Sequence, residues 1–207
     1  MDDCCRGKEQ ELAQLRGTQA RVLKVVLAIN ASMFLIEFTA GVIASSTALM
    51  ADSVDMLGDA LVYVLSLYVI DRGVRWRAGA AFAKGLLILA LGGWIVLEAA
   101  VKLQEQVVPT SSLMAIFGGL ALVANLICLR LLWPLRARDV NTRSTFECSR
   151  NDVISNVGVL LASAAVSYTG QAWPDLAVGL IVAALFLRSA WSVLREAWPQ
   201  MWGHLPQ

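Results

Sequence analysis

The sequence predicts an all-α membrane protein: a bundle of six transmembrane helices with both termini in the cytoplasm. Three observations support this prediction. The 207-residue chain is 57% hydrophobic and 16% charged, whereas soluble domains have about 45–50% apolar and about 25% charged residues. Six apolar windows are long enough to cross a bilayer as helices. The positively charged residues gather in alternate connections between these windows.

Each window approaches the roughly 20 apolar residues that a membrane-spanning helix needs. We expect the spans at 22–45, 47–70, 82–103, 112–133, 146–168 and 174–195. The connections are short: SST separates the first two spans, QEQVVPTSS follows the third, and TGQAWPD precedes the last. Gly170 and Pro174 mark this last turn, and Pro134 ends the fourth span.

The basic residues predict on which side of the membrane each connection lies. They occur before the first span, between the second and third, between the fourth and fifth, and at the end of the sixth. These residues are Arg6, Lys8, Arg16, Arg21, Arg72, Arg75, Arg77, Arg136, Arg138, Arg143 and Arg195. The opposite connections carry Lys102 and little else. Because cytoplasmic connections are enriched in lysine and arginine, both termini are expected in the cytoplasm.

Composition also narrows the possible partners and compartments. The formal net charge of +1 gives no indication of a nucleic-acid partner, and none is expected. The cysteines suggest no disulfide framework, since Cys4 and Cys5 are adjacent and Cys128 and Cys148 lie in apolar stretches. The first twenty residues lack the apolar core of a signal peptide. We therefore expect a multi-pass protein of the cell membrane, which is the cytoplasmic (inner) membrane in a bacterium.

Three aspartates interrupt the second span, in the stretch ADSVDMLGDA at residues 51–60. An aspartate at the centre of a membrane helix costs about 2.5–3.5 kcal/mol, so a helix that retains three of them has a use for them. Asp55 and Asp59 are four residues apart and share one helix face, with Asp52 on a flanking line. This face predicts a polar site inside the membrane.

The fifth span repeats the four-residue spacing. Cys148 and Asp152 are four apart, and Asn156 extends the same line by one turn. Two helices that each offer two ligand-type side chains one turn apart can surround a metal ion. Oxygen and thiolate donors suit Zn²⁺ and similar divalent ions, and such an ion would neutralise the clustered carboxylates. Glu147, next to Cys148, is an alternative donor.

Other interpretations of these side chains remain open. The aspartates could cap helices or pair with arginines, of which Arg150 is the obvious partner. Cys148 could be a small buried hydrophobe, as many isolated cysteines are. Asn30 and Glu37, seven apart in the first span, share a face that either lines the same pathway or bonds between helices. The possible accessory groups at the metal site are Asp52, Glu147, Asn156 and Glu37.

These residues resemble the cation diffusion facilitator family, whose members export divalent metal ions. The similar stretches are SSTALMADSVDMLGDALVY, SRNDVISNVGVLLA and TGQAWPDLAVGLIVAALFL, and the six-span layout extends the resemblance over nearly the whole chain. In this family the transport site has two residues on the second helix and two on the fifth, each pair a His or Asp followed by Asp four residues later. The resemblance assigns these positions to Asp55, Asp59, Cys148 and Asp152. Cys148 departs from the usual pattern, and a thiolate favours softer ions.

The resemblance implies a metal/proton antiporter that works by alternating access, and not an enzyme. Its expected substrates are a divalent ion (Zn²⁺, or a similar ion such as Cd²⁺ or Co²⁺) and protons, with no resident cofactor. The expected organisation is an N-terminal cytoplasmic arm at 1-21, a six-helix transmembrane transport domain at 22-197 and a short C-terminal tail at 198-207. Family members typically continue into a cytoplasmic domain that dimerises, and the sequence is read as a form lacking it. A homodimer would then form through the membrane helices or the arm.

Two functions of other classes remain open. The chain could be an intramembrane enzyme that uses aspartates as acid and base or Cys148 as nucleophile, although no histidine in any predicted span could serve as its base. It could also be a membrane metal sensor or accessory subunit that does not transport. Metal flux in sealed vesicles distinguishes all three.

Overall fold

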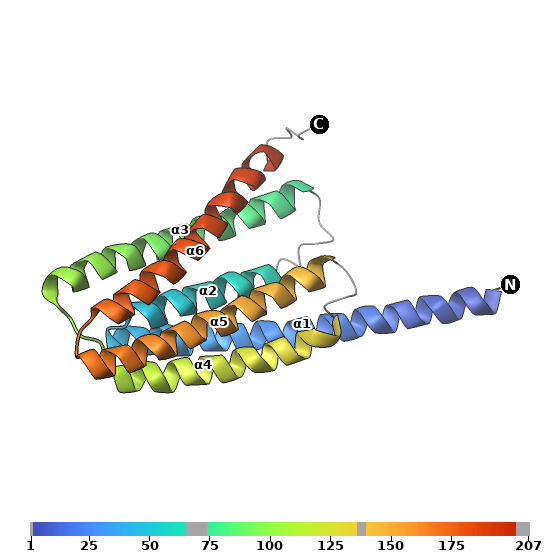
Figure 1. The fold of residues 1–207 in the computed structure, drawn as a ribbon. Coiled ribbons are helices and arrows are strands. Elements are labelled where there is room, and N and C mark those ends of the chain that lie inside the picture. The colour runs from blue at the N-terminus through green and yellow to red at the C-terminus, as the bar shows by residue number, and fades with distance from the viewer. Residues whose placement is uncertain (1, 65–73, 136–139, 202–207) are drawn as a thin grey trace.

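The computed structural model describes residues 2–64, 74–135 and 140–201. Within these ranges the side chains of residues 2–19 and of several residues near helix ends, Glu147 and Cys148 among them, lie outside the description. So do Arg72, Arg136, Arg138 and the predicted tail from residue 202 onwards. The described chain is helical throughout, apart from short connections (Figure 1).

Six α-helices follow one another: α1 (Asp2–Ala44), α2 (Thr47–Val64), α3 (Val74–Glu105), α4 (Ser111–Leu132), α5 (Val140–Thr169) and α6 (Trp173–Met201). A short 3₁₀-helix, Trp133–Leu135, follows α4. The prediction of an all-α bundle of six helices is confirmed for the described residues. Helices suit these apolar segments because a helix satisfies every backbone polar group internally, as lipid requires.

Five of the described segments are long and apolar enough to cross a membrane: Ala20–Ala44, Ala78–Glu105, Ser111–Leu132, Ser149–Thr169 and Trp173–Gln200. The chain is therefore a multi-pass membrane protein. The second predicted span is absent from this set for two reasons. Its three aspartates make α2 less apolar, and its apolar continuation at 65–70 lies outside the described residues.

Three tight connections join the helices at one end of the bundle, between α1 and α2, α3 and α4, and α5 and α6 (Figure 1). Each contains one residue with positive φ: Ser45 at 55°, Gln106 at 55° and Gly170 at 63°. Only Gly170 is the residue type that adopts this conformation without strain. A backbone hydrogen bond from Thr110 to the Ala44 carbonyl (2.9 Å) joins two of these connections.

The helices pack as two groups. α1 packs mainly on α2 and α4 on α5, while α3 packs mainly on α6. Figure 1 shows α3 and α6 lying side by side along one side of the other four helices. α6 also packs on α2 and α5, so it is the main contact between the pair and the group of four.

Small residues allow α3 and α6 to approach closely. They recur every seven positions along the buried face of α3: Ala78, Gly85, Gly92 and Ala99. A Cβ atom on Gly85 would lie 2.9 Å from Leu194 Cγ, and one on Gly92 would lie 2.5 Å from Leu187 Cδ2. Such close helix packing over small residues is typical of membrane helices. The α3–α6 pair is thus a tightly packed unit.

The first turn of α6 holds the first turn of α2. The carboxylate of Asp175, which is 1% exposed, accepts hydrogen bonds from the Ser46 hydroxyl and from the backbone N–H groups of Thr47 (2.7 Å) and Ala48 (3.1 Å). It therefore caps α2 from a different helix. Beside it, a Cβ atom on Gly179 would lie 2.7 Å from the Thr47 carbonyl carbon. These contacts set the position of α2, and hence of its aspartates, relative to α6.

Candidate metal site

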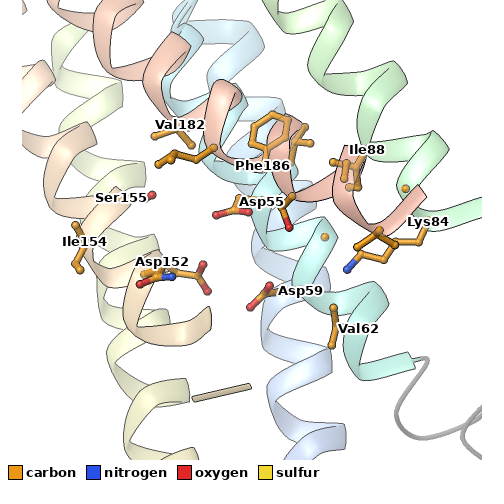
Figure 2. A pocket seen from close by; sticks show the side chains of 18 residues that line it. Asp55, Asp59, Val62, Lys84, Ile88, Asp152, Ile154, Ser155, Val182 and Phe186 are labelled. Atoms are coloured by element: carbon orange, nitrogen blue, oxygen red, sulfur yellow. The ribbon is translucent and has the colours of Figure 1, made fainter. Parts of the chain in front are cut away.

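The helix α2 presents its aspartates in two directions. Asp55 and Asp59, one helical turn apart, line a cavity of about 650 Å³ between α2, α3, α5 and α6 (Figure 2). Asp59 is 8% exposed and Asp55 is half-buried. Asp52 is 1% exposed and is not among the residues that line the cavity, although its carboxyl group interacts electrostatically with that of Asp55.

Asp152 faces these carboxylates from α5. It lines the same cavity, is 3% exposed, and interacts electrostatically with Asp59 and Asp55 (Figure 2). Its Oδ2 atom has no hydrogen-bond donor within the described part of the chain. The structure thus brings together three of the four residues that the sequence indicates for the site. A cation is the simplest means of compensating such a buried, unpartnered oxygen.

The fourth predicted ligand stays a prediction. The side chains of Cys148 and of its alternative, Glu147, lie outside the described residues, although the backbone of α5 places residue 148 one turn before Asp152. Among the described side chains, no group of three or more acidic, histidine or cysteine residues is compact enough to hold a metal ion. The three carboxylates therefore line the cavity without converging on one point.

A lysine also lines this cavity. Lys84 of α3 is half-buried, and its ammonium group is an electrostatic neighbour of the Asp55 carboxylate. In Figure 2 its side chain extends from α3 towards the part of α2 that carries Asp55 and Asp59. The sequence pointed instead to Arg150 as the basic partner, but Arg150 is exposed. Lys84 lies inside the predicted span 82–103. A charged residue within a membrane span indicates a functional site, so extending this argument from the aspartates to lysine would have found Lys84.

A second pair of carboxyl groups lies between α1 and α2. Glu37 is 0% exposed, neither of its oxygens has a hydrogen-bond donor among the described residues, and its acidic neighbour is Asp52. Two ionised carboxylates have no proton to share, so they can form a hydrogen bond only when one is protonated. Glu37 is not among the residues that line the cavity of Asp55.

The side-chain amides of Asn30 and Asn156 each donate a hydrogen bond to a backbone carbonyl of their own helix. The Asn30 amide donates to the Val26 carbonyl (3.0 Å) and contacts Cys128 Sγ at 3.8 Å, which links α1 to α4. The Asn156 amide donates to the Asp152 carbonyl (2.7 Å). Neither side chain lines the cavity. Asn30 thus follows the interhelical interpretation.

Comparison with known proteins identifies the family to which this fold belongs. The family model described as the cation efflux transmembrane domain matches residues 23–201. The chain belongs to this family, in agreement with the resemblance noted in its sequence.

Individual relatives carry related names. The chain is 26% identical over 193 residues to the metal cation efflux system protein CzcD of Cupriavidus metallidurans. This alignment covers 87% of this chain and 61% of the relative. It is 25% identical over 191 residues to the zinc transporter ZitB of Escherichia coli (86% and 61%). It is 24% identical over 195 residues to the cadmium, cobalt and zinc/H(+)-K(+) antiporter of Bacillus velezensis (87% and 62%). The chain thus spans about three fifths of the length of these relatives.

Proposed function

We propose that this protein exports divalent metal ions across the membrane in exchange for protons. The observation that carries the proposal is the cavity into which two helices direct Asp55, Asp59 and Asp152, where one Asp152 oxygen lacks a donor. Family membership favours transport over an intramembrane enzyme. The relatives named for zinc, cadmium and cobalt support a divalent substrate of that group.

The proposed ligands are the carboxylate oxygens of Asp55, Asp59 and Asp152 together with the thiolate of Cys148. A four-coordinate set of oxygen and sulfur donors suits Zn²⁺, and the sulfur favours Cd²⁺ over harder ions. The three carboxylates do not converge in this conformation, so metal binding would draw their oxygens together. Asp52 would support Asp55 from the adjacent face of α2.

Exchange for protons follows from the chemistry of these ligands. Carboxylates and thiolates bind metal only when deprotonated, so metal capture releases protons and the return of protons expels the metal. The packing suggests which parts move: the α3–α6 pair slides against the other four helices and opens the cavity to alternate sides. We further propose that both termini are cytoplasmic, because the basic residues gather on that side.

The proposal is tested by metal flux into proteoliposomes that contain a metal-sensitive dye. We expect uptake of Zn²⁺, Cd²⁺ or Co²⁺ by the wild type. Asp59→Ala and Asp152→Ala should each lower flux at least about 100-fold, the upper range that loss of even an outer-shell group costs in metal sites.

The matched control is Glu105→Ala. It removes an exposed carboxylate at the end of α3 that is not among the residues lining the cavity. Helical content measured by circular dichroism verifies that each variant is folded. Wild-type flux from a folded Asp59→Ala or Asp152→Ala variant would contradict the proposed site. Metal binding without any flux would point to the sensor or accessory subunit instead.

A further inference from the structure

The cavity that holds the three carboxylates has a mixed charge. Its lining includes Asp55 and Asp59 from α2, Asp152 from α5 and Lys84 from α3 (Figure 2). Lys84 is half-buried and interacts electrostatically with Asp55. A positive charge thus lies where the proposed substrate, also positive, would bind.

The packing of α3 on α6 explains why the lysine points into the cavity. Its neighbour Gly85 is buried against α6, where a Cβ atom would lie 2.9 Å from Leu194 Cγ and 3.3 Å from the Ala190 carbonyl oxygen. Consecutive residues on a helix point about 100° apart. With Gly85 against α6, Lys84 is turned about 100° away from α6, to the side on which the cavity lies.

The direction of the side chain gives a second reason to assign Lys84 a role. Near the end of a membrane helix, a lysine can extend its ammonium group to the interface. The Lys84 side chain instead extends towards the carboxylates. Its charge offsets part of the repulsion among them, as an ion would.

We propose that Lys84 is the resident counter-cation of the metal site, which occupies the carboxylates when no metal is bound and is displaced when a divalent ion enters. This inference rests on the proposed function. Because the ammonium group and the metal ion share Asp55 and repel each other across one cavity, the lysine lowers metal affinity and promotes release. It also selects against monovalent cations, whose single charge gains no advantage over the ammonium group.

The test is the equilibrium affinity of the purified full chain for Zn²⁺, measured by competition with a chelating dye, in wild type, Lys84→Gln, Lys84→Met and Lys84→Arg. The Gln and Met variants should bind Zn²⁺ at least about tenfold more tightly, equivalent to about 1.4 kcal/mol, because they lack the competing charge. Lys84→Arg keeps the charge and should stay near the wild-type affinity. In vesicles, the Gln and Met variants should release metal more slowly.

The matched control is Lys24→Gln, which removes an exposed lysine of α1 that does not line the cavity. Removing a charge from a membrane span favours insertion, so the Met variant is expected to fold even if the Gln variant does not. Unchanged or weaker Zn²⁺ affinity in Lys84→Met would overturn the inference and identify Lys84 as a lysine that only reaches the interface. The same result would leave the proposed function intact, which fails only if the wild type itself neither binds nor transports metal.

Discussion

Asp152 shows at the scale of one residue why this cavity requires a positive charge. Its carboxylate is 3% exposed, one of its oxygens lacks a donor among the described residues, and aspartates of α2 face it. Unpaired burial of a carboxylate is costly, and additional carboxylates nearby increase the cost by repulsion. In our proposals a divalent ion compensates this carboxylate directly, while the Lys84 ammonium group acts on the neighbouring Asp55.

The proposed ligand Cys148 predicts which ions the site prefers. If its thiolate is a ligand, Cys148→Ser should weaken Cd²⁺ binding more than Zn²⁺ binding, since sulfur favours the softer ion and a neutral hydroxyl is a poor ligand for both. Affinities for the two ions, measured on wild type and Cys148→Ser by dye competition, give the ratio directly. The same substitution at Cys128 is the control and should leave the ratio unchanged, because Cys128 contacts Asn30 and does not line the cavity, although its thiol is within electrostatic range of Asp59 and Asp152. An unchanged ratio in Cys148→Ser would remove the thiolate from the site.

At the scale of helices, the contact of α6 with the start of α2 positions the aspartates. Asp175 caps α2 from the neighbouring helix, and Gly179 brings the two backbones together. Asp55 and Asp59 lie two to three turns further along α2, so a shift at its first turn moves both carboxylates relative to Asp152.

The close approach at Gly179 predicts a large effect from a single methyl group. Gly179→Ala places a Cβ atom 2.7 Å from the Thr47 carbonyl carbon, so the helices must separate, which typically costs about 1–3 kcal/mol. The thermal midpoint of the protein in detergent should fall, and flux should fall with it. Gly93→Ala is the control, because a Cβ atom there meets nothing within 4 Å and alanine favours a helix. Equal midpoints for the two variants would show that the contact does not hold α2.

At the scale of the whole molecule, the two groups of helices support the alternating access that we propose. The α3–α6 pair is held together by close small-residue packing, while its contact with the other helices includes the open cavity. Lys84 lies on one group and the carboxylates on the other, so a sliding motion changes the distance between them. In our proposals, the opening of the cavity is therefore coupled to the position of the Lys84 charge.

The proposed proton exchange is tested on the complete transport cycle. As metal enters proteoliposomes, protons should leave, so a luminal pH dye should report a rise in pH that follows metal accumulation. Asp59→Ala vesicles should show neither signal under the same metal gradient. Metal accumulation with constant luminal pH in the absence of a permeant buffer would indicate a uniporter.

The boundaries of the helices were predictable at one end of the bundle and only in part at the other. The spans at 22–45 and 112–133 match the end of α1 at Ala44 and the limits of α4 at Ser111–Leu132 within a residue. At the end opposite the tight connections, α1 and α3 instead extend past their apolar windows, so that α1 begins at Asp2 and α3 at Val74. Turn residues stop a helix locally, whereas a charged segment beyond the bilayer can remain helical, and apolarity alone does not reveal it.

The sequence by itself determined the number of helices and the aspartate faces, because lipid permits few alternatives to an apolar helix and a four-residue spacing always shares a face. Only the tertiary structure decided which charges meet. It placed Lys84 beside Asp55, directed Glu37 to Asp52 and left Arg150 exposed. These pairings depend on how each helix is rotated about its axis. That rotation is set by close contacts such as those of Gly85 and Gly179 with helices that are far away in the sequence. Spacing along one helix carries no information about that rotation.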